Sequence, residues 1–140
     1  MELTIKLLEG FNDIEFGISK EKFLETMGQA AQTETISEPD EPVTTILLNY
    51  PEMQTSFFFE GKNGKFYLNS CDTTNRESLL FGKKIFDSDK NGIVELFRNM
   101  GFEKYETAME EWGEMRLTFE NSMADFYFKD RKLVSVTWGY

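Results

Sequence analysis

Two stretches of the chain place apolar residues at helical spacing. In SKEKFLETMG, residues 19–28, the apolar positions Phe23, Leu24 and Met27 share one face. In DKNGIVELFRNMG, residues 89–101, the same spacing recurs from Ile93 to Met100. A serine or aspartate stands at the start of each stretch and a glycine at its end, as is typical of helix caps. The pattern therefore predicts two helices, over 19–28 and 89–101.

Short apolar runs bounded by turn residues predict strands in both halves of the chain. The principal candidates are residues 43–50, 53–60, 65–71, 114–120, 122–129 and 132–138. The weaker candidates are residues 1–8, 80–86 and 102–107. Asn63-Gly64 predicts a two-residue hairpin turn, and Asp130-Arg131 a second tight turn. The polar segment 28–45 contains two prolines and is expected to be an exposed loop.

The two halves resemble each other. When Gly28 is set on Gly101, the apolar positions of the two helices coincide. When the run 57–59 is set separately on 126–128 and the turn that follows, two residues longer in the first copy, is allowed for, Cys71 falls on Trp138 at the end of the last strands. We therefore predict a single domain, residues 1–140, built from two repeats at about 14–80 and 81–140. The predicted fold class is α+β, with two tandem units that each contain a helix and an antiparallel meander of three to four strands. The runs SFFF and ADFYF have apolar residues on both faces, which predicts cover on both faces or a partner on one.

Composition narrows the classes of function. The 140 residues include 25 acids and 15 bases, a net charge of −10, and no histidine. This charge disfavours nucleic acid and anionic membranes as partners and favours a basic protein. The lone Cys71 cannot form an intramolecular disulfide and indicates a reducing compartment. With no signal-like start and no long apolar run, the expected location is the cytoplasm.

Residues 87–98, DSDKNGIVELFR, resemble the opening of a calcium-binding EF-hand loop. Asp87, Asp89 and Asn91 stand where oxygen ligands are required, but Arg98 occupies the last position, where calcium needs a bidentate glutamate. Since a cation would repel the ion, we interpret this segment as the start of a helix, with Ser88 or Asp89 as its cap.

We find no pattern that predicts catalysis. Cys71 has no histidine to activate it, and we interpret it as a structural residue on a strand. Adjacent acids such as Glu110-Glu111 are expected to be solvated, and no glycine-rich phosphate loop is present. We therefore predict a protein that is not an enzyme and needs no cofactor or metal.

The acidic residues gather in two segments. Residues 23–61 contain seven acids and no Lys or Arg, and residues 103–120 contain six acids against Lys104 and Arg116. Trp112 lies inside the second segment and could anchor a cationic partner. The alternative is that these acids keep an aromatic-rich protein soluble. The predicted partner-binding residues are Glu38, Asp40, Glu41, Glu110, Glu111 and Trp112.

The order of a helix followed by an antiparallel meander, found twice, resembles the β-lactamase-inhibitor-protein fold and the related small outer-membrane assembly lipoproteins. FGISKEKFLETMG (16–28), SFFFEGKNGKFYLNS (56–70) and LTFENSMADFYFKDRKLVSVTWG (117–139) carry the resemblance. The chain departs from both families, because the inhibitors are secreted with disulfides and the lipoproteins have a lipidated N-terminal cysteine. Its FGxSxxxFL opening also resembles small acidic bacterial proteins, some of which are immunity proteins for toxins.

Three functional hypotheses follow. The first is a cytoplasmic, non-catalytic binding protein, most concretely an immunity-type inhibitor whose acidic surface occludes a basic toxin or enzyme. The second is a small-ligand-binding or enzymatic domain with an apolar pocket between sheet and helices. That pocket would be lined by Phe57, Phe59, Phe126 and Phe128. The third is weak homodimerisation along an exposed edge strand, for which the C-terminal residues 133–140 are the candidate.

Overall fold

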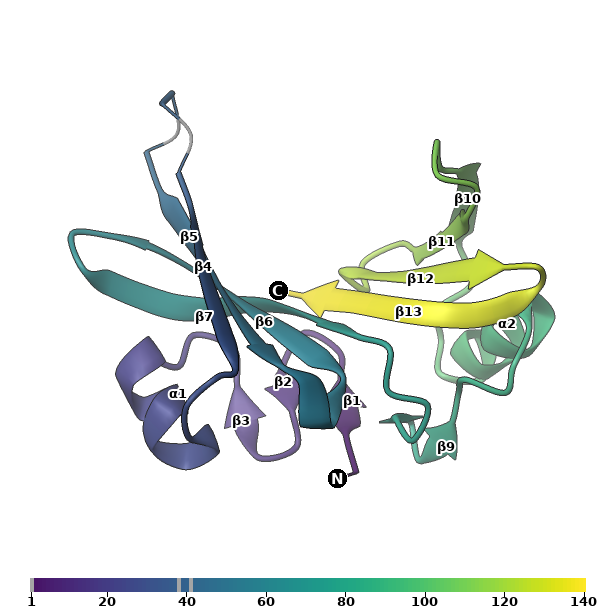
Figure 1. Cartoon of the computed structure of the whole chain (residues 1–140). Helices are drawn as coiled ribbons and strands as arrows, with labels where there is room; N and C mark the ends of the chain where they lie inside the picture. Colours follow the sequence, from purple (N-terminus) through teal and green to yellow (C-terminus); the bar gives the residue numbers. More distant parts are fainter. Residues whose placement is uncertain (1, 38, 41) are drawn as a thin grey trace.

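The computed structural model of the chain describes residues 2–37, 39–40 and 42–140 (Figure 1). The helices are α1 Lys20–Met27 and α2 Lys90–Asn99, with a short 3-10 turn η1 at Pro51–Met53. The strands of the first half are β1 Thr4–Lys6, β2 Gly10–Phe11, β3 Ile14–Glu15, β4 Gln32–Ile36, β5 Thr44–Tyr50, β6 Thr55–Lys62 and β7 Lys65–Thr73. Those of the second are β8 Leu79–Leu80, β9 Lys83–Lys84, β10 Tyr105–Met109, β11 Met115–Phe119, β12 Ala124–Lys129 and β13 Lys132–Gly139.

The predicted fold class, α+β with two helix-and-meander units, is wrong. The structure is mostly β, with 47% of residues in strands and 15% in helices. Its strands form one sheet of eight and a second sheet of five. The prediction missed strand content because residues 28–45, expected to be a loop, contain all of β4 and the start of β5. The strands within residues 1–8 and 80–86 also belong to the separate five-stranded sheet and do not extend the predicted meanders.

The eight-stranded sheet runs continuously from one half of the chain to the other. Its strand order is β10-β11-β12-β13-β7-β6-β5-β4, and every neighbouring pair is antiparallel. From either edge to the middle, four strands follow one another in chain order. The internal duplication stays a prediction, which a superposition of the two halves would test.

The C-terminal strand is not an edge strand, so the prediction that residues 133–140 form an exposed edge is wrong. β13 lies in the middle of the large sheet, between β12 and β7. The edges are instead β4 and β10. β13 is apolar because its inward-facing side chains Val136 and Trp138 are completely buried.

Both helices begin where the sequence predicts. The Ser19 side chain accepts a hydrogen bond from the Lys22 amide at 3.3 Å, and the Asp89 carboxylate accepts one from the Gly92 amide at 2.9 Å. These bonds satisfy amides that the first helical turn leaves free. The calcium-like segment is therefore the start of a helix, as predicted.

The predicted hairpin turns are also confirmed. Asn63 and Gly64 both have positive φ, 56° and 77°, between β6 and β7. Asp130 and Arg131, between β12 and β13, have φ of 52° and 69°. Two consecutive positive φ values are those of the tight turn that matches the twist of paired strands.

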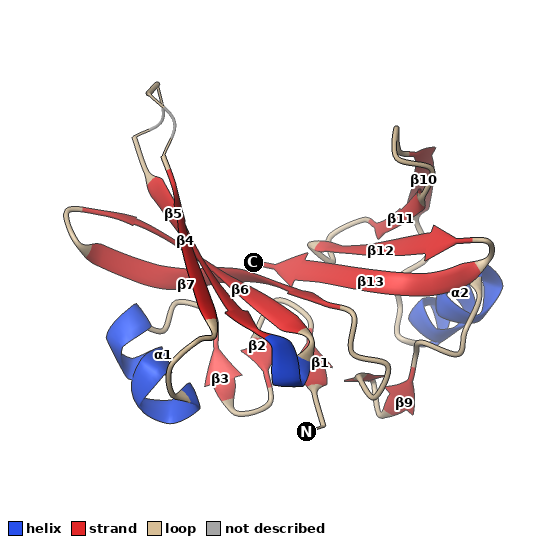
Figure 2. Ribbon diagram, in the orientation of Figure 1, coloured by secondary structure: helices blue, strands red, loops and turns tan. Residues whose placement is uncertain are grey.

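The core lies on one side of the large sheet, where both helices and the small sheet are found (Figure 2). Under the first half, Phe23 of α1 packs edge-on against Phe59 of the sheet, with ring centroids 4.9 Å apart. Under the second half, Phe97 of α2 stacks on Phe119 at 3.9 Å. Between them, the Trp138 Nε1–H donates to the carbonyl of Gly10 in the small sheet at 2.8 Å. The two layers are thus joined at both ends and in the middle.

Candidate functional site

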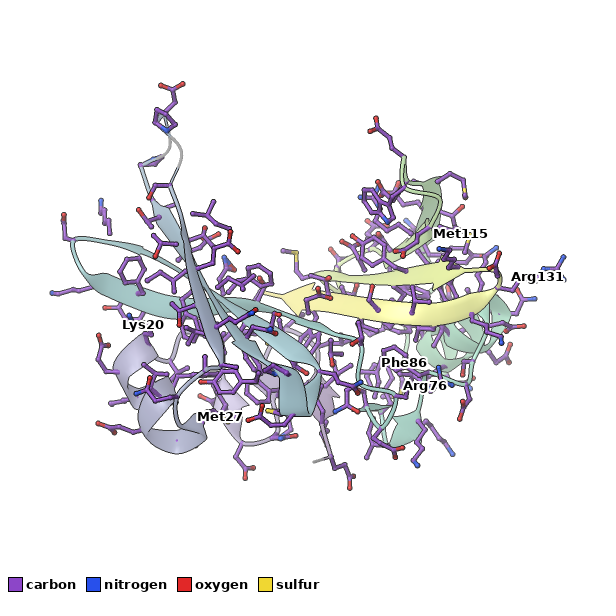
Figure 3. The ribbon with its side chains drawn as sticks, in the orientation of Figure 1. Lys20, Met27, Arg76, Phe86, Met115 and Arg131 are labelled. Atoms are coloured by element: carbon purple, nitrogen blue, oxygen red, sulfur yellow. The ribbon has the colours of Figure 1, made fainter. Side chains whose placement is uncertain are left out.

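The large sheet has one covered face and one open face. Along each long strand, fully buried side chains alternate with half-exposed ones, as in Thr55–Lys62 and Ala124–Lys129. Side chains are packed densely between the sheet and the elements beneath it, whereas those on the opposite side project more freely (Figure 3). We call the half-exposed side the outer face. Its central residues are Leu47, Asn49, Ser56, Phe58, Asp72, Thr137, Asp125, Tyr127, Thr118 and Arg116.

A row of polar side chains crosses the outer face from edge to edge. Its members are cross-strand partners in order, one from each strand: Gln32, Asn49, Ser56, Asp72, Thr137, Asp125, Thr118 and Glu106. Several are hydrogen-bonded to their neighbours. The Ser56 hydroxyl donates to Asn49 at 3.1 Å, and the Thr118 hydroxyl donates to Asp125. Hydrogen bonds between partners fix these side chains before any ligand arrives.

Asp72 lies at the centre of this row. Burial raises the pKa of its carboxyl, the hydrogen bond from the Thr137 hydroxyl at 3.3 Å opposes that rise, and the charge of Glu114 adds to it. Asp72 is therefore a partly desolvated acid in the middle of the surface. A cation placed near it would relieve the cost of its ionisation.

Aromatic side chains flank the polar row. The Trp112 ring lies 6.3 Å from Tyr127, measured between centroids, and is 61% exposed. Phe58 is half-buried on the other half of the outer face. The runs SFFF and ADFYF thus do place aromatic rings on both faces, and the described chain covers only one of those faces with other elements.

The charge of the surface is strongly negative. The two edge hairpins are residues 32–50, which contain β4 and β5, and residues 105–119, which contain β10 and β11. Together with the central outer-face residues named above, the described residues of these hairpins include one cation, Arg116. The described acids of the same set number eight: Glu34, Asp40, Asp72, Glu106, Glu110, Glu111, Glu114 and Asp125. Arg116 already pairs with Glu110 at 3.4 Å, which leaves a large excess of negative charge.

The structure divides the predicted partner-binding residues between the two edge hairpins. Glu110, Glu111 and Trp112 come together at the turn of the second, where Glu111 and Trp112 are exposed. Asp40 is exposed in the turn of the first. Glu38 and Glu41 lie outside the described residues. Both hairpins rise from the large sheet on the side away from the helices (Figure 1). The described members of the predicted set therefore lie at two tips that border one face, not in one cluster.

Sequence reasoning missed the acids on the sheet itself. Asp72 and Asp125 belong to strands, and Glu106 belongs to an edge strand whose bounds were predicted as 102–107. The available signal was strand alternation. Asp125 lies between the buried Ala124 and Phe126, so its side chain must point to the opposite face.

The side chains considered as candidates for catalysis or for lining a pocket are buried. Cys71 is fully buried, which confirms its predicted place on a packed strand, and burial raises the pKa of its thiol. Phe57, Phe59 and Phe126 are completely buried among other rings. Phe128 borders a hollow of about 600 Å³ next to the start of α2. Among the described residues, no group of three acids or cysteines is arranged to hold a metal ion.

A second hollow, of about 620 Å³, lies on the helix side and is lined in part by Arg76, Phe86 and Arg131 (Figure 3). Three of its charged groups are already engaged, because Arg76 is paired with Asp87 at 2.9 Å and the Asp89 carboxylate caps α2. The outer face is therefore the stronger candidate for a functional surface.

In the part of the chain that the structure describes, no helix has the length and apolar character required to cross a membrane. No family model, no curated protein and no solved structure matches this chain. The resemblances to inhibitor, lipoprotein and immunity families stay predictions.

Proposed function

We propose that this protein is a non-catalytic binding protein that docks a basic protein on its outer face. The observation that carries the proposal is the position of the two acidic hairpin tips. They border the same uncovered face of the sheet, and that face has its own partly buried acid and half-exposed aromatic rings. Tryptophan and tyrosine side chains are enriched among the residues that contribute most of the binding energy of protein interfaces.

An immunity-type inhibitor in a reducing compartment is the most concrete form of this proposal. Such a protein acts by covering a basic toxin or enzyme, and it needs no reactive group of its own. Trp112 would supply apolar contact, while Glu111 and Asp40 would steer the partner during association. The negative surface predicts fast association at low salt, which slows as salt screens the charges.

The proposal is tested by comparing variants of the outer face with a variant of the covered side. Proteins retained from the native host by the immobilised wild type are compared with those retained by Trp112→Ala combined with Glu111→Lys. Glu25→Lys on α1 is the control, because it also reverses the charge of an exposed acid, but on the side of the sheet that the helices cover.

The expected result is one basic protein that binds the wild type and the control but is lost with the double variant. Its association rate should fall as sodium chloride is added. Two results would contradict the proposal: a partner with no basic surface, or a basic partner that binds the double variant and the wild type equally well.

A further inference from the structure

Strand β10 is an open edge of the large sheet. It pairs with β11 on one side, and the ladder includes a bond from the Glu120 amide to the Lys104 carbonyl at 3.0 Å. At the other end, the Glu110 amide donates to the Glu114 carbonyl at 2.8 Å. Backbone groups of an antiparallel strand point alternately to its two sides. Residues 104, 106, 108 and 110 therefore direct their amides and carbonyls to β11, and Tyr105, Thr107 and Met109 direct theirs away from the sheet.

This edge lacks the usual protection against pairing. Edge strands are commonly guarded by lysine, proline or bulges. The segment YETAM, residues 105–109, contains none of these residues, and its five Cα partners on β11 are in unbroken register. It also exposes large apolar side chains: Tyr105 is 41% exposed and Met109 is 71% exposed. The other edge, β4, has the sequence QTETI and exposes mainly polar side chains.

We propose that β10 pairs antiparallel with β10 of a second copy of this chain, with Thr107 on the two-fold axis. In this register the outward-pointing groups of Thr107 would bond to those of its copy. The facing pairs would be Thr107 with Thr107, Glu106 with Ala108, Tyr105 with Met109, and Lys104 with Glu110.

The proposed register is self-complementary. Threonine pairs and contacts between methionine sulfur and an aromatic ring are favourable across strands. At each end a lysine faces a glutamate, and from Lys104 to Glu110 no acid faces an acid. Since the axis is perpendicular to the sheet, the two large sheets would become one, with both outer faces on the same side.

The dimer is expected to be weak and to be favoured by salt. A five-residue strand buries less surface than the roughly 1,200–2,000 Å² of a stable interface. Each copy also has a net charge of −10, so the copies repel each other in dilute buffer. Salt screens this repulsion. Binding of a basic partner has the opposite salt dependence, so the two proposals can fail separately.

Sedimentation equilibrium of the full chain over a concentration series, at low and high sodium chloride, tests the proposal. Thr107→Pro removes the outward amide and adds a bulky ring, yet it leaves the bonds to β11 intact because those come from neighbouring residues. We expect Thr107→Pro to weaken the dimer by at least about tenfold. Thr107→Val keeps the amide and should dimerise as the wild type does.

Cross-linking locates the interface directly. In the proposed register, Thr107→Cys would place two thiols at cross-strand positions whose Cα atoms are about 5.5 Å apart, within the range of a disulfide. The native Cys71 is fully buried and does not compete. Thr35→Cys on β4 is the matched control and should stay uncross-linked. A chain that is monomeric at every concentration and salt, a dimer unaffected by Thr107→Pro, or cross-linking of Thr35→Cys in place of Thr107→Cys would overturn the proposal.

Discussion

Cys71 and Trp138 are cross-strand partners at the junction where β7 meets β13, and the alignment of the two halves places them at equivalent positions. Their neighbours follow the same rule. Asp72 faces Thr137 and Ser70 faces Gly139, and exchanging the halves converts one pair into the other. This is the pattern of an isologous contact, in which the same surface is used by both partners. Whether this symmetric junction arose by doubling of one module stays a hypothesis, which a superposition of the two halves would test.

The indole of Trp138 is expected to be a major contributor to stability. Trp138→Phe would leave the buried Gly10 carbonyl without its donor and create a small void, at a cost of about 2–4 kcal/mol. Urea unfolding followed by circular dichroism measures the loss. Trp112→Phe is the control, because a ring that is 61% exposed should change the free energy of unfolding by less than about 0.5 kcal/mol. Equal effects of the two changes would show that the bond to Gly10 contributes nothing.

The Cys71 thiol should be unreactive in the native protein. It is fully buried, and burial raises its pKa, so both access and thiolate formation are suppressed. A thiol reagent at mildly alkaline pH is expected to label the chain only after denaturant is added, and the native rate should follow the opening of the sheet. Rapid labelling without denaturant would mean that the junction between β7 and β13 opens readily.

Asp72 makes stability depend on pH in a defined direction. Because burial raises the pKa of its carboxyl above the unfolded value of 3.8, the folded chain keeps this proton at pH values where the unfolded chain has lost it. The contribution of Asp72 to stability therefore falls as pH rises through the folded pKa, and the penalty persists at neutral pH.

Asp72→Asn removes that penalty and keeps an oxygen to accept the bond from Thr137. We expect the variant to have a higher free energy of unfolding than the wild type at neutral pH. The difference should shrink as pH falls below about 4, where both states are protonated. Denaturant titrations over a pH series measure this difference. Glu21→Gln, at an exposed position on α1, is the control, and a gain for Asp72→Asn that is the same at every pH would contradict the explanation.

The two helix caps should contribute similar amounts of stability. Ser19→Ala and Asp89→Ala each remove the acceptor of a first-turn amide and are expected to cost about 1 kcal/mol. Ser19→Asn and Asp89→Asn keep a capping oxygen and should be nearly neutral. Thermal unfolding of the four variants tests this expectation. A loss as large in the asparagine variants as in the alanine variants would assign the effect to something other than capping.

Local chemistry explains which elements were predicted correctly. The helix caps, the apolar helix faces and the turn at Asn63-Gly64 depend on residues only a few positions apart, so their sequence contains the information. The edge strand β4 could not be predicted in this way. Its sequence QTETI is mostly polar and is exposed throughout, and it becomes a strand because its backbone bonds to β5. Pairing with a neighbouring strand can thus override a weak local preference.

Only the part of the candidate surface that depends on residues close together in the chain could be predicted from the sequence. The acids and Trp112 of the hairpin turns stand out in composition, and the sequence was sufficient to select them. Asp72 and Asp125 were missed because their proximity follows from the order of strands in the sheet, with β13 between β7 and β12. A polar row that crosses eight strands leaves no local signature, since its members come from distant parts of the chain.

The amino-acid sequence alone determined the two helices, most of the long strands, the net negative charge and the absence of histidine chemistry. These properties depend on composition or on neighbours along the chain. Only the tertiary structure decided that β7 and β13 join the halves into one sheet, that β4 and β10 become its edges, and that both acidic hairpins rise from the same face. Those outcomes depend on backbone hydrogen bonds and core packing between segments far apart in sequence, which no local pattern specifies.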